Sequence, residues 1–158
     1  MANAILSKDT ISGKEGKAYA IIDNEYVQIL GLRKYLCKGQ LQKDPVSQVG
    51  TPNEQDKLKG IKWKVDLDYY YGTPIWTRLL MKFKRTGVFP DIKIVSINDD
   101  KQSSYGKQEV MVKGYIPDEI VVASLDESTA SMEASMPGTA SDCDTLEEFN
   151  DAPAELLN

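Results

Sequence analysis

The segment GIKWKVDLDYYY, residues 60–71, decides the class of fold. Apolar side chains occupy the odd positions from Ile61 to Tyr69, and charged side chains occupy the even positions from Lys62 to Asp68. A period of two predicts a β-strand that has one face on a core and the other face on water or on a charged neighbour. We therefore expect a protein built mainly from β-sheet.

Further strands are predicted on both sides of this segment. Residues 17–36 are typical of two strands joined by a turn at Asp23 and Asn24, because both residue types tolerate positive φ. Gly31 is expected to form a bulge in the second strand. Apolar runs also predict strands at 90–98, 110–116, 120–125 and 146–149. Those at 110–116 and 120–125 are apolar on both faces, which indicates burial between two sheets or against a neighbouring copy.

A single helix is predicted over residues 72–87. Thr73 suits the N-cap, Pro74 suits the first helical position, and Gly87 can close the helix behind a basic last turn. An apolar stripe at helical spacing predicts that the helix covers one sheet. The stripe consists of Ile75, Trp76, Leu79, Leu80 and Phe83.

Three segments lie outside these elements. Residues 1–16 are expected to form an N-terminal arm. Residues 38–58 are polar and contain Pro45, Gly50 and Pro52. A loop of this length usually indicates function or disorder, so we interpret it as a contact loop for a partner. Residues 127–145 are rich in Ser, Ala, Thr, Met and acid, which predicts a flexible acidic linker. At 158 residues, one domain is expected over residues 1–158.

The composition is that of a soluble protein. Hydrophobic residues make up 41% and charged residues 27% of the chain. No apolar run approaches the about 20 residues of a membrane-spanning helix, and the first residues do not form a signal peptide. We therefore expect no membrane anchor, and assembly in a cytoplasm. Cys37 and Cys143 match no metal spacing and are expected to be isolated thiols, although a disulfide stays open.

Charge is divided unevenly along the chain. All 19 Lys and Arg residues lie at or before Lys113, while 11 of the 24 Asp and Glu residues follow it. An acidic segment of this kind is often only a solvated tail. It also fits head-to-tail contacts, in which an acidic face of one copy meets a basic face of the next. Composition alone leaves both interpretations open.

Enzymatic chemistry finds little support. The sequence contains no histidine, which removes the commonest general base and zinc ligand. The glycines at 13–17 do not form a phosphate loop, because Lys8 stands where a glycine is required and Glu15 stands in place of Ser or Thr. Asp66 and Asp68 share a strand face with lysines, so charge pairing explains them better than acid–base catalysis. We expect no catalytic residue, no cofactor and no metal site.

Five segments that follow one another along the chain form a recognisable series: DTISGKEGKAYA at 9–20, TPIWTRLLMKFKRTG at 73–87, DIKIVSIND at 91–99, Ser124–Asp126 and Leu146–Phe149. TISGKEG is the most specific string among them. In this order the segments resemble the tail tube proteins of contractile-tailed phages, and most closely those of defective, phage-like elements of Gram-positive bacteria. The resemblance spans most of the chain.

The resemblance implies a mainly β fold: two packed antiparallel sheets in a tail-tube β-sandwich or barrel, with one flanking α-helix. It also implies rings of six copies, stacked helically into a hollow tube inside a contractile sheath. The implied partners are further copies, the sheath protein, the baseplate tube initiator and the tail terminator. The tube is then driven through an envelope, and DNA or ions pass along its bore. The implied location is the tail of a virion or of a phage-like particle such as a tailocin, assembled in the host cytoplasm.

Two sets of residues are candidate sites on this basis. Contacts between copies are expected from the arm and the polar loop: Ser12, Lys14, Glu15, Lys17, Gln40, Gln42, Lys43, Asp44, Gln48, Asn53 and Glu54. Carboxylates are expected on the bore: Asp66, Asp68, Asp118, Glu119, Asp126 and Glu127. An acidic bore repels phosphates, so double-stranded DNA would pass without specific binding.

Two alternatives remain open. The first is a free-standing β-sandwich binding module, for carbohydrate through Tyr69, Tyr70 and Tyr71 or for a protein ligand. The second is a tube component of a secretion system or baseplate with the same fold. The sequence also leaves open whether the particle carries a genome.

Overall fold

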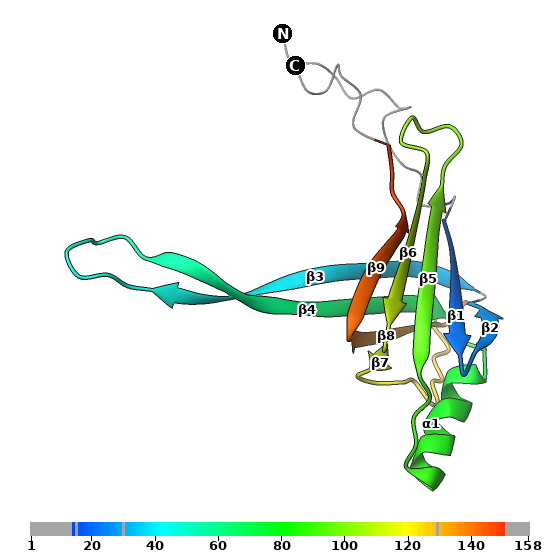
Figure 1. The fold of residues 1–158 in the computed structure, drawn as a ribbon. Helices are drawn as coiled ribbons and strands as arrows, with labels where there is room; N and C mark the ends of the chain where they lie inside the picture. Colours follow the sequence, from blue (N-terminus) through cyan, green and yellow to red (C-terminus); the bar gives the residue numbers. More distant parts are fainter. Residues whose placement is uncertain (1–13, 15, 30, 129, 151–158) are drawn as a thin grey trace. The chain divides into compact units, whose positions relative to one another are not determined.

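The computed structural model describes residues 14, 16–29, 31–128 and 130–150. These residues divide into two compact units, each built on one antiparallel sheet (Figure 1). The first unit contains residues 14, 16–29, 90–113 and 143–150. The second unit contains residues 31–89, 114–128 and 130–142. A mainly β fold with two antiparallel sheets and one helix, as the sequence predicts, is confirmed for this part of the chain.

The first unit is a five-stranded sheet with the order β2-β1-β5-β6-β9. Its strands are β1 (Gly16–Ile22), β2 (Glu25–Gln28), β5 (Ile92–Asp99), β6 (Lys107–Lys113) and β9 (Asp142–Glu147). Asp23 and Asn24 have φ values of 49° and 67°, which confirms the predicted two-residue hairpin turn. Its buried face includes the opposed pairs Ala20 with Ile94 and Ile94 with Val112.

The second unit is a four-stranded sheet with the order β3-β4-β8-β7. Its strands are β3 (Leu32–Val46), β4 (Gln55–Tyr70), β7 (Ile116–Pro117) and β8 (Glu133–Ala140). Val65, Leu67 and Tyr69 are buried while the residues between them are half-buried, so the period-two prediction is confirmed for the inner part of β4. On β8, Met136 lies opposite Leu67 and is also buried.

Helix α1 (Ile75–Thr86) belongs to the second unit, where the sequence predicts a helix. Pro74 rather than Thr73 is the N-cap residue, and no side chain caps the first turn. Gly87 closes the helix as predicted: its φ is 73° and its N–H donates to the Phe83 carbonyl at 2.8 Å. Trp76 is the buried member of the apolar stripe, and Phe83 is exposed and packs edge-on against Phe89.

Two predicted loops and one predicted bulge are wrong. Residues 38–58, predicted as a polar loop, belong to the hairpin of β3 and β4, and only residues 47–54 form its turn. The predicted linker over 127–145 contains β8 and most of β9. In both segments backbone pairing with a neighbouring strand overrides a polar composition. Gly31, predicted as a bulge, has a φ of 71° and lies in the turn between β2 and β3.

Two strand predictions also change. Residues 120–125, predicted as a strand, are irregular and pair with no strand among the described residues. The final strand runs over Asp142–Glu147 rather than 146–149. Apolar content alone predicted the first of these strands, and it carries no information on whether a partner strand is available.

Candidate functional site

The outer part of the β3–β4 hairpin is the most conspicuous surface of the second unit. β4 pairs with β8 only from Trp63 to Tyr70, so residues 40–46 and 55–62 pair only with each other among the described residues. Residues 40–62, here called the outer hairpin, extend well beyond β7 and β8 of the same sheet (Figure 1). Every one of these residues is exposed. A two-stranded ribbon of this kind has marginal stability unless a partner covers it.

One face of the outer hairpin is apolar. Leu41 lies opposite Ile61, and the next pair toward the core on the same face is Gly39 with Trp63. Val65, farther along this face, is buried. The side chains of Leu41 and Ile61 are 51% and 55% exposed. Leu58 continues this face across a register shift at Gln42 and Lys43. The core face of the sheet is thus extended into solvent as an apolar stripe.

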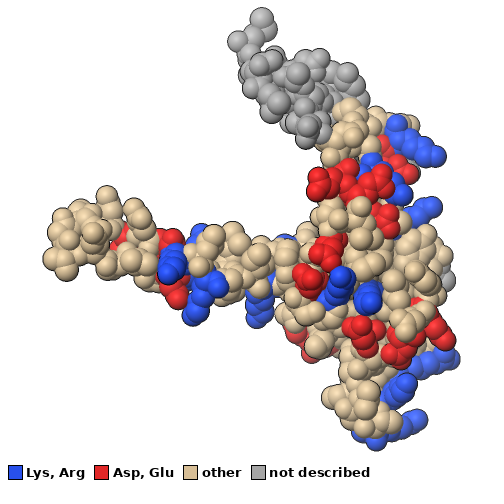
Figure 2. All heavy atoms as spheres, viewed as in Figure 1, with Lys and Arg blue, Asp and Glu red and all other residues tan. Residues whose placement is uncertain are grey.

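The opposite face carries lysines. Lys38 lies directly opposite Lys64, and Lys62 lies opposite Gln40. Like charges directly opposite each other destabilise a strand pair. Farther out, Lys59 forms an ion pair with Asp44 at 3.4 Å. Figure 2 shows the basic side chains spaced along the hairpin that projects to the left, with acidic ones among them.

Seven of the eleven predicted contact residues lie on the outer hairpin. Gln40, Gln42, Lys43 and Asp44 are on β3, and Gln48, Asn53 and Glu54 are in the turn. Lys14 and Lys17 are exposed, and Lys17 lies opposite Ile97 at the start of β1. Ser12 and Glu15 lie outside the described residues. The structure thus brings the loop candidates together on one ribbon.

Sequence reasoning missed the apolar residues of this ribbon. Leu41, Leu58 and Ile61 are the side chains that most need a partner, and only polar residues were selected there. The signal that could have identified them is the period-two pattern of residues 60–71. The outer end of that strand needs a paired strand, and a loop over residues 38–58 does not supply one.

The predicted bore carboxylates form two groups. Asp66 and Asp68 are half-buried on β4, opposite Leu36 and Lys34. The others are exposed in the irregular segment after β7: Asp118, Glu119, Asp126 and Glu127. Burial raises the pKa of the Tyr115 phenol, and the Asp118 and Asp66 carboxylates raise it further, so both groups lie within electrostatic reach of Tyr115.

The three consecutive tyrosines do not form one stacking platform. Tyr69 is buried in the core. The Tyr70 hydroxyl accepts a hydrogen bond from the Arg33 guanidinium at 2.7 Å, and the guanidinium carbon lies 5.2 Å from the centre of the Tyr70 ring. Arg33 also forms an ion pair with Glu133 at 3.0 Å. The Tyr71 hydroxyl donates to the Val122 carbonyl at 3.1 Å. Each ring is engaged in a different intramolecular contact, which disfavours carbohydrate stacking.

Neither a metal-binding cluster nor a membrane-spanning helix is found in the part of the chain that the structure describes. Among residues 14, 16–29, 31–128 and 130–150, no group of three or more Cys, Asp or Glu side chains is placed to hold a metal ion. The same part of the chain contains no helix with the length and apolarity needed to cross a membrane.

Comparison with known proteins points in one direction. A family model described as "Phage tail tube protein" matches residues 3–147. The chain is 26% identical over 148 residues to the phage-like element PBSX protein XkdM of Bacillus subtilis (strain 168), covering 94% of this chain and 98% of that protein.

Solved structures share the fold. A chain in the baseplate of the anti-feeding prophage superposes with a TM-score of 0.60 at 9% identity, covering 92% of this chain and 97% of the other. The SPP1 tail tube, determined by solid-state NMR and cryo EM, superposes with a TM-score of 0.55 at 12% identity, covering 94% and 86%. The fold is therefore shared with a chain of a baseplate and with a tail tube chain.

Proposed function

Because the chain belongs to the phage tail tube protein family, we propose that it forms the inner tube of a contractile phage or phage-like tail. In this proposal, copies close into rings of six, and the rings stack helically inside a sheath. The sheath protein, a baseplate initiator and a tail terminator are the further partners. The family membership supports tube formation, while the contractile tail and the number six follow from the resemblance in the sequence.

The edge of the four-stranded sheet supports ring closure. β3 pairs with β4 on one side, and no described strand pairs with its other side. A long exposed edge strand is a template for pairing with another chain. All neighbours in the order β3-β4-β8-β7 are antiparallel, so β3 of one copy can lie antiparallel to β7 of the next. Because β7 has two residues and β3 has 15, such pairing covers part of the β3 edge and repeats from copy to copy around a ring.

The outer hairpin is the observation that carries the proposal. It presents Leu41, Leu58 and Ile61 to solvent, although no other described strand pairs with this ribbon. Removing these side chains from water requires a surface outside the described chain, and a second copy supplies one in every ring or stack. Contact between copies is thus proposed for this hairpin rather than for a loop.

The bore is proposed to include Asp66, Asp68 and Asp118. Asp66 and Asp68 alternate with the buried Val65 and Leu67, so they project from the sheet face opposite the core. Carboxylates repel phosphates, which lets DNA move along a bore without binding to it. Lys34 lies opposite Asp68, so the charge of this face is mixed near the hairpin base.

Electron microscopy of purified protein tests the proposal. Concentrated wild-type protein is expected to form rings and tubes in negative stain, with matching fast-sedimenting species. A shortened variant, in which Asn-Gly replaces residues 42–60, keeps the pair Leu41 and Ile61 beside a two-residue turn. It is expected to stay monomeric while keeping a β-sheet circular dichroism spectrum and a cooperative thermal transition. Wild-type protein that remains monomeric in both microscopy and sedimentation contradicts the proposal.

A baseplate tube component is the second candidate, because one similar chain comes from a baseplate. The same micrographs separate the two functions. Tubes of many rings support the tail tube, whereas single rings or short stacks that do not grow support a baseplate component.

A further inference from the structure

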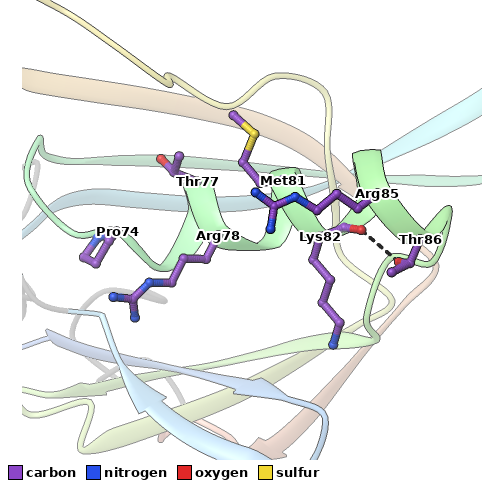
Figure 3. A pocket seen from close by; sticks show the side chains of 7 residues that line it. All are labelled: Pro74, Thr77, Arg78, Met81, Lys82, Arg85 and Thr86. Carbon is purple, nitrogen blue, oxygen red and sulfur yellow. Dashed lines mark hydrogen bonds between the residues drawn. The ribbon is translucent and has the colours of Figure 1, made fainter.

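Helix α1 carries four basic residues and no acidic one. The basic residues are Arg78, Lys82, Lys84 and Arg85. Arg78, Lys82 and Arg85 are spaced four and three residues apart, so they lie on one side of the helix and are called its basic face here. Figure 3 shows Arg78 and Lys82 extending from the same side of α1. The basic face is opposite in charge to the chain as a whole, which has a net charge of −5.

Two residues of the basic face, Arg78 and Lys82, are unfavourable for the helix that bears them. Lys84 and Arg85 lie in the last turn, where the helix dipole favours cations. Arg78, in contrast, lies in the first turn, where the dipole favours anions, and it is four residues from Lys82, a spacing at which like charges repel. None of the four basic side chains forms an ion pair with another described residue. The helix alone therefore gives no reason for this charge pattern.

The same side of the helix is hollowed. A surface hollow of about 540 Å³ is lined by Arg78, Lys82 and Arg85 together with Pro74, Thr77, Met81 and Thr86 (Figure 3). Met81 and Pro74 give it an apolar part, and Arg78, Lys82 and Arg85 give it a basic part. A matching ligand has an apolar side chain flanked by carboxylates.

The chain contains such a segment. Residues 119–128, called the acidic loop here, carry Glu119, Asp126 and Glu127, and all three are exposed. Leu125 directly precedes two of them and is 100% exposed. The backbone N–H and hydroxyl of Ser128 both donate to Asp126, at 3.0 and 2.7 Å, which fixes the end of the loop. The loop thus presents an uncovered leucine next to two carboxylates.

We propose that the basic face of α1 binds the acidic loop of a second copy. Leu125 enters the hollow beside Met81, and the carboxylates of Glu119 and Glu127 pair with Arg78, Lys82 or Arg85. Within one chain Leu125 is fully exposed and the basic side chains form no described ion pair, so the two surfaces are complementary between copies. A helix on one copy and a loop on the next make a heterologous contact, which closes into a ring when the rotation allows it.

This inference rests on the proposed self-assembly and assigns surfaces to it. It also moves Glu119, Asp126 and Glu127 from the bore, where the sequence analysis puts them, to a contact between copies. Nucleic-acid phosphate is the competing occupant of the basic face.

Charge exchange tests the inference. R78E/K82E and E119K/E127K are each expected to raise the protein concentration needed for ring or tube formation at least tenfold. The loop variant leaves Asp126 and its hydrogen bonds intact. The quadruple variant R78E/K82E/E119K/E127K is expected to restore assembly at least in part, because the charges of Arg78, Lys82, Glu119 and Glu127 are all reversed while Arg85 keeps its charge. K84E/K101E changes the net charge as much as R78E/K82E but leaves the basic face intact, and it is expected to assemble normally.

A second readout separates the contact from folding. R78E/K82E exchanges one like-charge pair for another and places one carboxylate in the first turn, where the helix dipole favours anions, so the thermal midpoint of its monomer should stay close to that of wild type. A lower midpoint together with lost assembly would mean that these residues only hold the fold, and would overturn the inference.

The remaining outcomes are distinct. If wild-type protein forms no rings, the proposed function fails. If wild type and R78E/K82E both form tubes at the same concentration, or if the quadruple variant does not recover, this inference alone is overturned. If R78E/K82E assembles normally but loses binding to a double-stranded DNA probe in a gel-shift experiment, phosphate is the occupant and the inference is also overturned.

Discussion

Trp63 lies across the backbone of Gly39 at the base of the outer hairpin. The two residues are directly opposite each other, and a Cβ atom at Gly39 would lie 2.9 Å from Cζ3 and 3.3 Å from Cε3 of the Trp63 ring. A glycine opposite an aromatic ring is a recognised way to pin the register of a strand pair. This pair lies where the buried sheet becomes an exposed ribbon.

Gly39→Val is therefore expected to destabilise the monomer by about 1–3 kcal/mol through overpacking against the ring. Gly60 is the matched control, because it lies on the same hairpin and no atom lies within 4 Å of a Cβ built there. Gly60→Val should change stability by no more than about 0.5 kcal/mol. Urea denaturation measures both values. Equal effects of the two substitutions would show that the packing of the Trp63 ring does not require a glycine at position 39.

Lys64→Glu is expected to stabilise the monomer. The substitution converts a repulsive pair with Lys38 into an attractive one, and such cross-strand pairs contribute about 0.2–1 kcal/mol. A double-mutant cycle with Lys38→Glu isolates the interaction, since the double variant again has like charges and should lose the gain. The gain should shrink in 1 M salt, where charges are screened within about 3 Å. A gain that persists in the double variant would point to a cause other than Lys38.

The sequence predicted elements whose local signals are strong. The alternation at 61–69, the turn at Asp23 and Asn24, and the helix end at Gly87 are all encoded within a few residues. The turn and the helix end are found in the structure, and the alternation is found in its inner part, residues 65–69. The hairpin was missed because residues 38–58 contain two prolines and many polar side chains, and the ribbon has no buried face beyond Trp63 to impose alternation.

The candidate site was predictable only in part for the same reason. The polar residues of the hairpin were selected as contacts, but the apolar stripe of Leu41 and Ile61 becomes visible only when the register of β3 and β4 is known. The acidic loop was mispredicted for a different reason. Its apolar residues, Val122 and Leu125, suggested a buried strand, whereas the structure leaves both exposed.

Tyr115 should make stability depend on alkaline pH. Burial raises the pKa of its phenol above the usual value of about 10, and its hydroxyl donates to the Met136 carbonyl at 2.9 Å. The folded state therefore retains this proton at pH values where the unfolded chain has lost it. The stability that the group contributes is complete below about pH 10 and is lost as the pH rises toward the folded pKa.

Comparison of Tyr115→Phe with wild type measures this contribution. At pH 8 the variant should be less stable by about 1 kcal/mol, because the hydrogen bond is missing. Between pH 10 and 11 the difference should shrink, since only the wild type has this group to ionise. Lysines titrate in both proteins and cancel. Tyr26→Phe is the control, because Tyr26 is 78% exposed. A difference that stays constant with pH would contradict the raised pKa.

Deletion of residues 2–14 is expected to spare the fold and block tube growth. β1 begins at Gly16, and its first described pair in the sheet is Gly16 with Asn98, so the deletion leaves every described strand pair in place. The truncated protein should keep the thermal midpoint of wild type and yet form at most isolated rings in negative stain, because the arm is proposed as a contact between rings. A variant with the same residues replaced by a Gly-Ser segment of equal length separates sequence from length, and it should fail as the deletion does. If either variant forms tubes at the wild-type concentration, the TISGKEG arm is only a linker, and the outer hairpin and the basic face of α1 are left as the contacts that build the tube.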